Sequence, residues 1–168
     1  MRFRVGIAAL STLLAMGADY SIMEMTVPIH GLTLANLRDT FEEVHDGHKH
    51  EAIDVVEPRG TPVLAVAPGT IRKLFLSKPG GNTIYQFDEP GLYCYYYGHL
   101  DGYAEGLHEG MSVKAGDVIG FVGSTGNADA RTPHLHFAIT ELGPEKQWWK
   151  GNAIDPFPFL VAAVKRAK

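Results

Sequence analysis

A regular succession of short β-type runs covers most of the chain after residue 60 and constrains the fold more than any other feature. Each run is rich in β-branched and aromatic residues, and turn signals such as PG, PGG and EPG separate the runs. The runs are TPVLAV, GTIRKLFL, NTIYQF, LYCYYYGHL, DVIGFVG and PHLHFAI. This pattern predicts a mainly β protein, folded as an antiparallel sandwich or a partly open barrel.

Short helical segments are expected at both ends of this β region. Residues 34–48 show weak helical periodicity at Leu34, Leu37, Phe41 and Val44, which is enough for one or two turns. The tail after residue 140 predicts a strap across the sheet that ends in a short helix.

Two adjacent tryptophans, Trp148 and Trp149, lie in this tail. Buried aromatic residues are common and cleft aromatics are rare, so we interpret both as part of the strap. The alternative is that they line a substrate groove.

The length and composition fit one domain. A chain of 168 residues with 45% hydrophobic residues can bury a single core, and no shift in composition marks a second module. We divide the chain into a signal peptide (1–18), an N-terminal lead segment (19–33), the folded domain (34–160) and a C-terminal tail (161–168).

The N-terminus has the pattern of a secretory signal. Arg2 and Arg4 precede an apolar run from Val5 to about Gly17, and small residues follow. About thirteen apolar positions are too few for a comfortable membrane span, although an uncleaved anchor is the alternative. Both readings place the domain outside the cytoplasm, with the periplasm favoured over the extracellular space. Removal of a cleaved signal would leave no membrane span.

The charge and the cysteine content limit the partners. The formal net charge is −4 and no cluster of lysines and arginines occurs, so the chain is a poor candidate for binding nucleic acid. Cys94 is the only cysteine and cannot form an internal disulfide, so we expect it to pack in the sheet. We expect a monomer.

Five residues have the chemistry of a zinc site: His50, Asp54, His99, His134 and His136. Imidazole nitrogens and carboxylate oxygens are preferred zinc ligands, and a catalytic zinc has three protein ligands with one position open. The chain therefore offers three ligands and two further histidines.

The spacing allows these residues to meet. Side chains alternate along a strand, so His134 and His136 point to the same face. The same rule aligns His50 with Asp54. A helix would also align this second pair, but Pro58 and the residues after it leave no room for three helical turns. The H-E-x-x-H motif of helical zinc proteases does not occur.

The motifs H-x-x-x-D, GTPVLAVAPGTI, YYYGHL, VKAGDVIGFVGSTG and HLHF together resemble those of the lysostaphin-type or LytM-like zinc peptidases of family M23. The resemblance extends over residues 34–160, and it is specific because all the motifs occur in the family's order. It implies a secreted endopeptidase that hydrolyses stem or cross-link peptides of bacterial peptidoglycan.

The resemblance also implies a role for each residue. His50, Asp54 and His136 would be the ligands of Zn²⁺, while His99 and His134 would act on the water and on the tetrahedral intermediate. Zinc lowers the pKa of a bound water to about 7, which suits amide hydrolysis at neutral pH. The family usually has glycine at the position of Ala52, and this smallest possible change should leave the site intact.

Other residues near these motifs have plainer interpretations. Tyr95 and Tyr97 share the face of His99 by strict alternation and would then line the cleft, but packing within the sheet is favoured. The polar loop GSTGNADARTP before HLHF is a candidate for substrate contacts. Four further histidines are interpreted as solvated surface residues. These are His30, His45, His48 and His108.

Two alternative functions follow from the same residues. Degenerate relatives act as wall-binding or amidase-activating proteins without catalysis, but they usually lack a ligand, and none is missing here. The run EGMSVKAGDVIGFVG also resembles biotinyl or lipoyl carrier domains. No lysine follows at a hairpin tip, so this likeness indicates only a shared barrel-sandwich-hybrid topology.

Overall fold

The computed structural model describes residues 22, 24–45 and 47–167. The signal peptide predicted for residues 1–18 lies outside this part of the chain, and the proposed division into segments stays a prediction. No helix within the described residues is long and apolar enough to cross a membrane.

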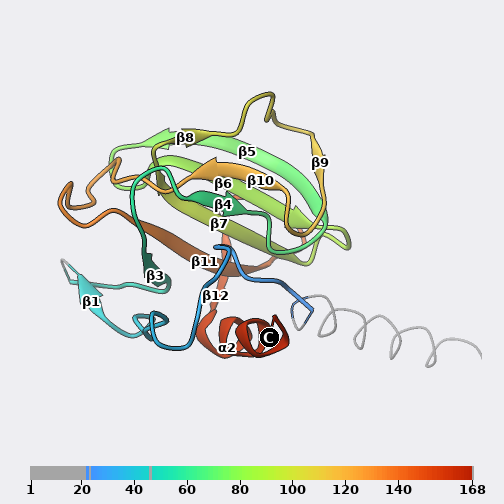
Figure 1. The fold of residues 1–168 in the computed structure, drawn as a ribbon. Helices are drawn as coiled ribbons and strands as arrows, with labels where there is room; N and C mark the ends of the chain where they lie inside the picture. The colour runs from blue at the N-terminus through green and yellow to red at the C-terminus, as the bar shows by residue number, and fades with distance from the viewer. Residues whose placement is uncertain (1–21, 23, 46, 168) are drawn as a thin grey trace, which may run out of the picture.

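Twelve strands and one helix make up the described fold (Figure 1). They are β1 (Val44–His45), β2 (His48–Lys49), β3 (Ile53–Val56), β4 (Pro62–Leu64), β5 (Gly69–Ser77), β6 (Gly81–Asp88), β7 (Tyr93–Leu100), β8 (Gly102–Tyr103), β9 (Ser112–Val113), β10 (Val118–Phe121), β11 (His134–Leu142), β12 (Gly151–Ile154) and α2 (Phe157–Arg166).

All strand pairings of the described residues are antiparallel. The main sheet has the order β12-β11-β7-β6-β5-β9, and β3 pairs with the first half of β11. A smaller sheet, β4-β10-β8, lies across its inner face in Figure 1. The prediction of a mainly β, antiparallel fold is therefore confirmed.

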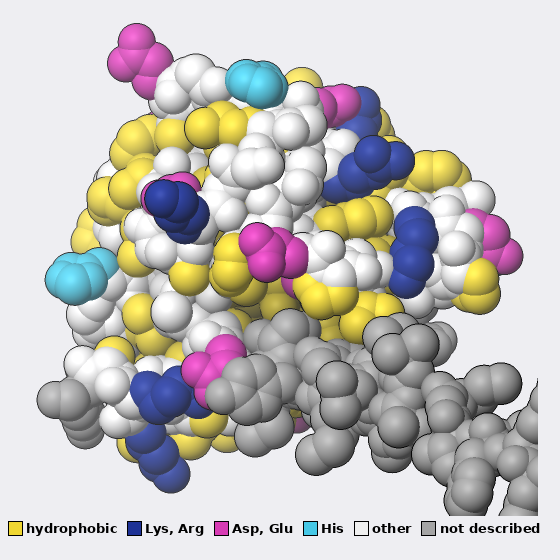
Figure 2. All heavy atoms as spheres, turned by 90° about the vertical axis from the view of Figure 1, so that its right-hand side faces the viewer, with side chains coloured by type: hydrophobic (Ala, Val, Ile, Leu, Met, Phe, Trp, Pro, Cys, Tyr) yellow, Lys and Arg dark blue, Asp and Glu magenta, His cyan; other side chains and the backbone are white. Residues whose placement is uncertain are grey.

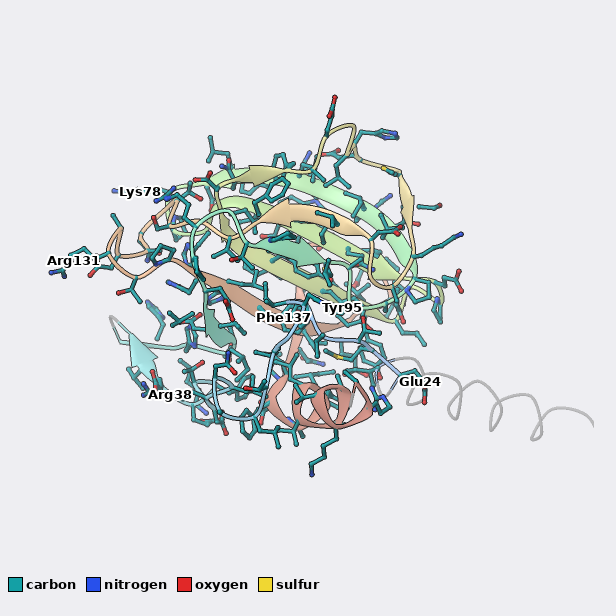
Figure 3. All side chains as sticks on the ribbon, in the orientation of Figure 1. Glu24, Arg38, Lys78, Tyr95, Arg131 and Phe137 are labelled. Atoms are coloured by element: carbon teal, nitrogen blue, oxygen red, sulfur yellow. The ribbon has the colours of Figure 1, made fainter. Side chains whose placement is uncertain are left out.

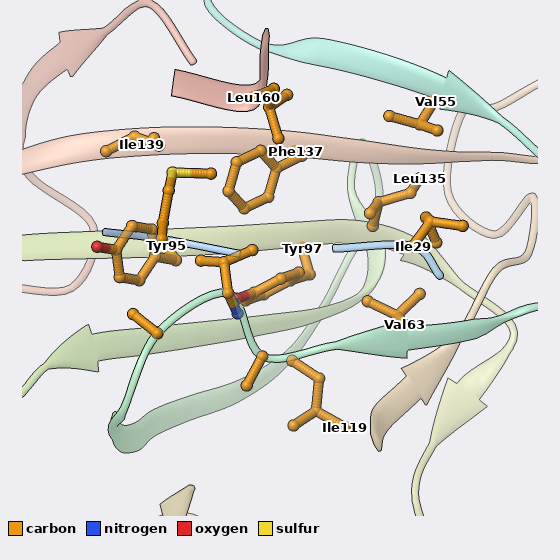
Figure 4. Packing of buried hydrophobic residues seen from close by; sticks show 14 of the residues in the cluster. Ile29, Val55, Val63, Tyr95, Tyr97, Ile119, Leu135, Phe137, Ile139 and Leu160 are labelled. Carbon is orange, nitrogen blue, oxygen red and sulfur yellow. Dashed lines mark hydrogen bonds between the residues drawn. The ribbon is translucent and has the colours of Figure 1, made fainter. Parts of the chain in front are cut away.

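One apolar core lies between the two sheets and extends beneath α2 (Figure 4). Val63 of β4 and Ile119 of β10 meet Tyr97 of β7 and Phe137 of β11 there, and all four are fully buried. Leu160 of α2 reaches the other side of Phe137. Burial of these large side chains is the main source of stability for a domain of this size.

A polar network crosses this core without leaving its groups unpaired. The buried Tyr97 hydroxyl donates to Oε1 of Gln86 at 2.8 Å and accepts the Val66 N–H at 3.0 Å, while Nε2 of Gln86 donates to the Ala67 carbonyl at 2.6 Å. Buried polar groups cost little when they are hydrogen-bonded in this way, so the network ties β6 and β7 to the segment after β4. Cys94, also on β7, is buried as a free thiol, as expected.

The helix predicted within residues 34–48 is wrong. Turns and the small β1–β2 hairpin occupy this segment. The carbonyl groups that a helix would use accept hydrogen bonds from later residues instead: Glu43 from the His50 N–H and Phe41 from the Glu51 N–H. The segment is thereby held against the start of β3, which a local periodicity argument does not anticipate.

The predicted helical end of the chain is confirmed as α2, which covers the core beside β11 and β12 (Figure 1). Arg166 donates from Nη2 to the Met25 carbonyl at 2.7 Å and so connects the two ends of the described chain.

The predicted site residues lie toward one end of the molecule. In Figure 3 the labelled Tyr95 and Phe137 lie inside, whereas Lys78 and Arg131 lie at the end formed by the β5–β6 turn and the loop before β11. Figure 2 shows the opposite end, where acidic and basic side chains are interspersed among apolar ones. The five predicted site residues do not lie at that end; they lie toward the loops near Arg131.

Candidate metal centre

The strand register brings the predicted residues together at one end of the main sheet. His136 of β11 lies directly opposite Asp54 of β3 on one side and Gly98 of β7 on the other. Residues that face each other across antiparallel strands project to the same side of the sheet, so the His136 and Asp54 side chains meet. His50 lies just before β3 rather than on the strand as predicted, and the residue that follows it, Glu51, has a left-handed φ of 54°.

Three potential ligand atoms form a nearly equilateral triangle. Nε2 of His50 lies 3.1 Å from Nδ1 of His136, and Oδ1 of Asp54 lies 3.2 Å from each of these nitrogens. Ligands of a tetrahedral zinc at the usual bond lengths are about 3.3 Å apart. The donor set and its dimensions therefore fit a zinc ion.

The burial and charge of the Asp54 carboxylate favour the binding of a cation. Its Oδ1 is buried and lies 3.2 Å from an imidazole nitrogen of His50 and of His136, with no other polar partner among the described residues. Burial would raise the pKa of Asp54, but the interactions with His136 and His50 outweigh it and hold the pKa far below its usual value. A buried, ionised carboxylate oxygen that faces two imidazole nitrogens is well suited to bind a metal cation.

Thr40 positions both ligands of the first motif. Its carbonyl accepts the Nδ1–H of His50 at 3.0 Å, which leaves the lone pair of Nε2 free to face the other ligands. Its buried hydroxyl donates to the Ala52 carbonyl at 3.0 Å and accepts the Asp54 N–H at 3.1 Å. Ala52 itself is fully buried. The three ligand atoms lie close together although this position holds alanine rather than glycine.

His99 and His134 adjoin the triangle and have the same tautomer. Nδ1 of His99 lies 2.9 Å from the Thr125 carbonyl, and Nδ1 of His134 lies 2.9 Å from the Thr132 carbonyl. A carbonyl can only accept, so Nδ1 carries the proton in both rings and Nε2 is the basic nitrogen. The two rings are 4.9 Å apart, and Nε2 of His134 lies 3.8 Å from Oδ2 of Asp54.

Backbone geometry brings His99 to the site. Its φ of 60° lies in the left-handed region, so alternation along β7 breaks at this residue. Two turns meet beside it: Gly81 and Gly126 have φ of 66° and 76°, and a Cβ on either would overlap the other turn. This contact fixes the carbonyl of Thr125 beside His99.

The other pKa values follow from burial and neighbouring charge. Burial, together with the neighbouring His136, lowers the pKa of His99 to about 4. Burial also lowers the pKa of His136, and Asp54 offsets only part of that effect. For His50, burial acts in the same direction, but Asp54 and the Thr40 carbonyl outweigh it and raise the pKa.

The break at His99 also decides which tyrosines face the cleft. Tyr95 and Tyr97 are fully buried in the core, so packing in the sheet is confirmed and cleft lining is wrong for both. Tyr96 projects to the site instead, and its ring lies edge-on to the ring of His136 at 5.7 Å.

A cleft of about 560 Å³ opens above the triangle. Asn127, Ala128 and Asp129 of the loop before β11 line it, as expected for the GSTGNADARTP segment. His30, His48 and His108 are exposed, as predicted, although His48 borders a second groove that continues from the site.

The strap interpretation fits Trp148, which packs on Phe75 and Tyr85 of the main sheet, but not Trp149, which is 62% exposed. Trp148 and Trp149 line this second groove, together with Tyr85 and Tyr96. Sequence reasoning also missed Thr40 and Tyr96. Tyr96 could have been found from the sequence, because it lies three residues before His99 on a strand whose alternation ends at that histidine. No local sequence pattern marks Thr40.

Comparisons with known proteins agree with the site. The model of peptidase family M23 matches residues 48–156. The L-Ala–D-Glu endopeptidase of Bacillus subtilis is 33% identical over 118 residues, which cover 67% of this chain and 35% of that protein. Lysostaphin of Staphylococcus simulans is 37% identical over 119 residues, covering 70% of this chain and 22% of that protein.

Solved structures give the same result. The catalytic domain of the antimicrobial peptidase lysostaphin from Staphylococcus simulans superimposes with a TM-score of 0.59 at 37% identity, covering 68% of this chain and 81% of that domain. This chain spans about a third or less of the full length of the two curated relatives named above, so the likeness concerns one domain of each. The matched residues include the entire His and Asp cluster, and the chain belongs to peptidase family M23.

Proposed function

We propose that this chain is a zinc metalloendopeptidase that hydrolyses peptide cross-links of bacterial peptidoglycan. The observation that carries the proposal is the triangle of His50, Asp54 and His136, whose edges of 3.1 to 3.2 Å match a zinc coordination shell. The substrate is inferred from relatives named as an L-Ala–D-Glu endopeptidase and a glycyl-glycine endopeptidase.

Nε2 of His50, Oδ1 of Asp54 and Nδ1 of His136 would hold the metal. Zinc, when bound, supplies a Lewis acid for the scissile carbonyl and a water that ionises near neutral pH. The negative charge of Asp54 compensates the cation, and the Thr40 carbonyl keeps the correct nitrogen of His50 directed at the site.

His99 and His134 would move the protons. Each presents Nε2 as a base, because its Nδ1–H is engaged by a backbone carbonyl. Nε2 of one histidine would accept the proton of the attacking water and deliver it to the leaving amine. The other histidine, carrying a proton taken from solvent on its Nε2, would donate a hydrogen bond to the oxyanion. Both side chains are mostly shielded from solvent, which strengthens these interactions.

This proposal includes export of the enzyme, because peptidoglycan lies outside the cytoplasm. The basic and apolar pattern at residues 1–18 supports a cleaved signal, with processing near Gly17 or Ala18. Mass spectrometry of the exported protein tests this, and an intact Met1 would contradict it.

Digestion of purified, cross-linked sacculi tests the function itself. We expect the zinc-loaded protein to cleave the cross-linked peptides of the sacculi. Mass spectrometry should identify shorter peptides with new amino termini, and a chelator should stop their formation. Sacculi that stay intact although one zinc is bound per chain would overturn the enzymatic proposal in favour of a wall-binding or amidase-activating role.

Thr40 provides a separate test of the ligand geometry. Replacing Thr40 with valine removes the hydroxyl that holds the Ala52 carbonyl and the Asp54 N–H while preserving the shape of the side chain. We expect zinc affinity, measured by competition with a chelator, to fall about 10- to 100-fold. Thr40→Ser retains the hydroxyl and should restore the affinity. Equal zinc affinity of Thr40→Val and the wild type would contradict this role.

A further inference from the structure

A continuous series of aromatic ring contacts leads away from the metal centre. The ring of His136 contacts Tyr96 at 5.7 Å, Tyr96 contacts Tyr85 at 4.9 Å, and Tyr85 contacts Trp148 at 4.7 Å. Trp148 in turn contacts Trp149 at 5.1 Å. These four aromatic residues come from β6, β7 and the β11–β12 connection, and we call them, together with Phe75, the aromatic arm.

The aromatic arm borders a groove of about 540 Å³ that is continuous with the metal centre. His50, His99 and His136 line this groove as well as contributing to the site. At its outer end Trp149 is 62% exposed and Phe75 is 40% exposed. Large aromatic side chains exposed side by side next to a catalytic cleft are typical of a binding surface.

The two sides of the metal centre differ in character. On one side the cleft is lined by the loop before β11, including the carboxylate of Asp129; Asn127 of this loop lines both grooves. On the other side Lys49 is the only lysine, arginine, aspartate or glutamate among the described lining residues. Its ammonium is paired with Glu42 at 2.6 Å, so the lysine charge at this groove is compensated. Glu51 and Lys150 border an adjoining pocket that shares Tyr85, Tyr96, Trp148 and Trp149.

We propose that the aromatic arm binds a sugar ring of the glycan strand to which the cleaved peptide is attached. This inference rests on the proposed function, because it concerns the same substrate. Peptidoglycan offers two kinds of group next to a cross-link: short peptides with methyl and charged side chains, and hexose rings with flat C–H faces. A groove lined by several aromatic side chains, with a single charged residue that is already paired, suits a sugar ring better than a charged peptide.

Direct binding tests the proposal without hydrolysis. The full chain is titrated with a soluble β-1,4-linked N-acetylhexosamine tetrasaccharide, and the indole N–H resonance of Trp148 is followed by NMR. We expect this resonance to shift on addition of the sugar, and Trp149→Ala to weaken the affinity about three- to tenfold. Leu76→Ala is the matched control, since Leu76 is a 71% exposed apolar side chain on β5 that does not line the groove.

Hydrolysis gives a second comparison. Wild type, Trp149→Ala and Leu76→Ala are each assayed on intact sacculi and on cross-linked peptides freed from the glycan. We expect the ratio of the two rates to fall about three- to tenfold in Trp149→Ala and to stay at the wild-type value in Leu76→Ala.

The outcomes separate the two proposals. If Trp149→Ala slows both substrates equally and no sugar binds, the arm holds the peptide and the inference is wrong. If neither binding nor rate changes, the arm has no role in recognition and the inference is also wrong. Sugar binding by a chain that hydrolyses neither substrate would support the arm and overturn the proposed endopeptidase activity.

Discussion

Replacing Asp54 or His136 with alanine will release zinc and abolish hydrolysis. Each substitution removes one corner of a triangle whose edges are 3.1 to 3.2 Å. Two remaining ligands cannot hold the ion against a chelator. After zinc loading and dialysis against a weak chelator, we expect about one zinc per wild-type chain and less than about 0.2 per variant chain by metal analysis.

His108→Ala serves as the control for this experiment. His108 is exposed and its Nδ1 lies 3.0 Å from the Glu109 carbonyl, away from the metal centre, so zinc content and activity should match the wild type. Circular dichroism identifies variants that have lost their fold. A folded Asp54→Ala or His136→Ala protein that retains one zinc would show that the ligand assignment is wrong.

Much of the site follows from patterns that a sequence displays directly. His134 and His136 are separated by one residue on a strand, and this spacing alone places both on one face. The residues of this strand that face the core can also be recognised in the sequence, because Leu135 and Phe137 are apolar and alternate with the histidines. Strand alternation depends only on local backbone geometry, so it transfers well from sequence to structure.

The remaining features depend on contacts between distant segments. His99 reaches the site because its φ is positive, and this conformation is stabilised by the approach of two turns at Gly81 and Gly126. Strict alternation from His99 would place Tyr95 and Tyr97 at the cleft, the alternative that is not favoured, whereas the structure places Tyr96 there. Thr40 lies outside the segment that matches the family, and only the folded chain shows that it contacts His50 and Asp54.

The tryptophans illustrate a different limit. A preference for burying aromatic residues is a statistical statement about all proteins, and it favoured the strap. Trp148 and Trp149 lie in the connection between β11 and β12. Phe75 and Tyr85, which belong to two other strands, contact Trp148 there. The groove that results is a property of the tertiary arrangement, and no short segment encodes it.

His99→Ala and His134→Ala will leave zinc bound but reduce turnover about 10²- to 10⁴-fold, the range that general acid–base catalysis supplies. Neither residue contributes an atom to the triangle, and the Nδ1 of each is already engaged by a backbone carbonyl. Loss of either Nε2 therefore removes a proton acceptor or an oxyanion donor without removing a ligand. Zinc content and kcat on cross-linked peptides, measured on the same samples, check this expectation.

The comparison with the Asp54 and His136 variants distinguishes ligands from catalytic residues, because ligand variants lose both zinc and turnover whereas catalytic variants lose turnover alone. His30→Ala, at an exposed position, controls for the loss of an imidazole and should change neither zinc content nor kcat. If His99→Ala releases the metal, the three ligands have been chosen wrongly among five correct residues. If His134→Ala retains near-normal hydrolysis, the catalytic role assigned to His134 is wrong, and the mechanism must be redrawn among the same five residues even though the fold assignment stands.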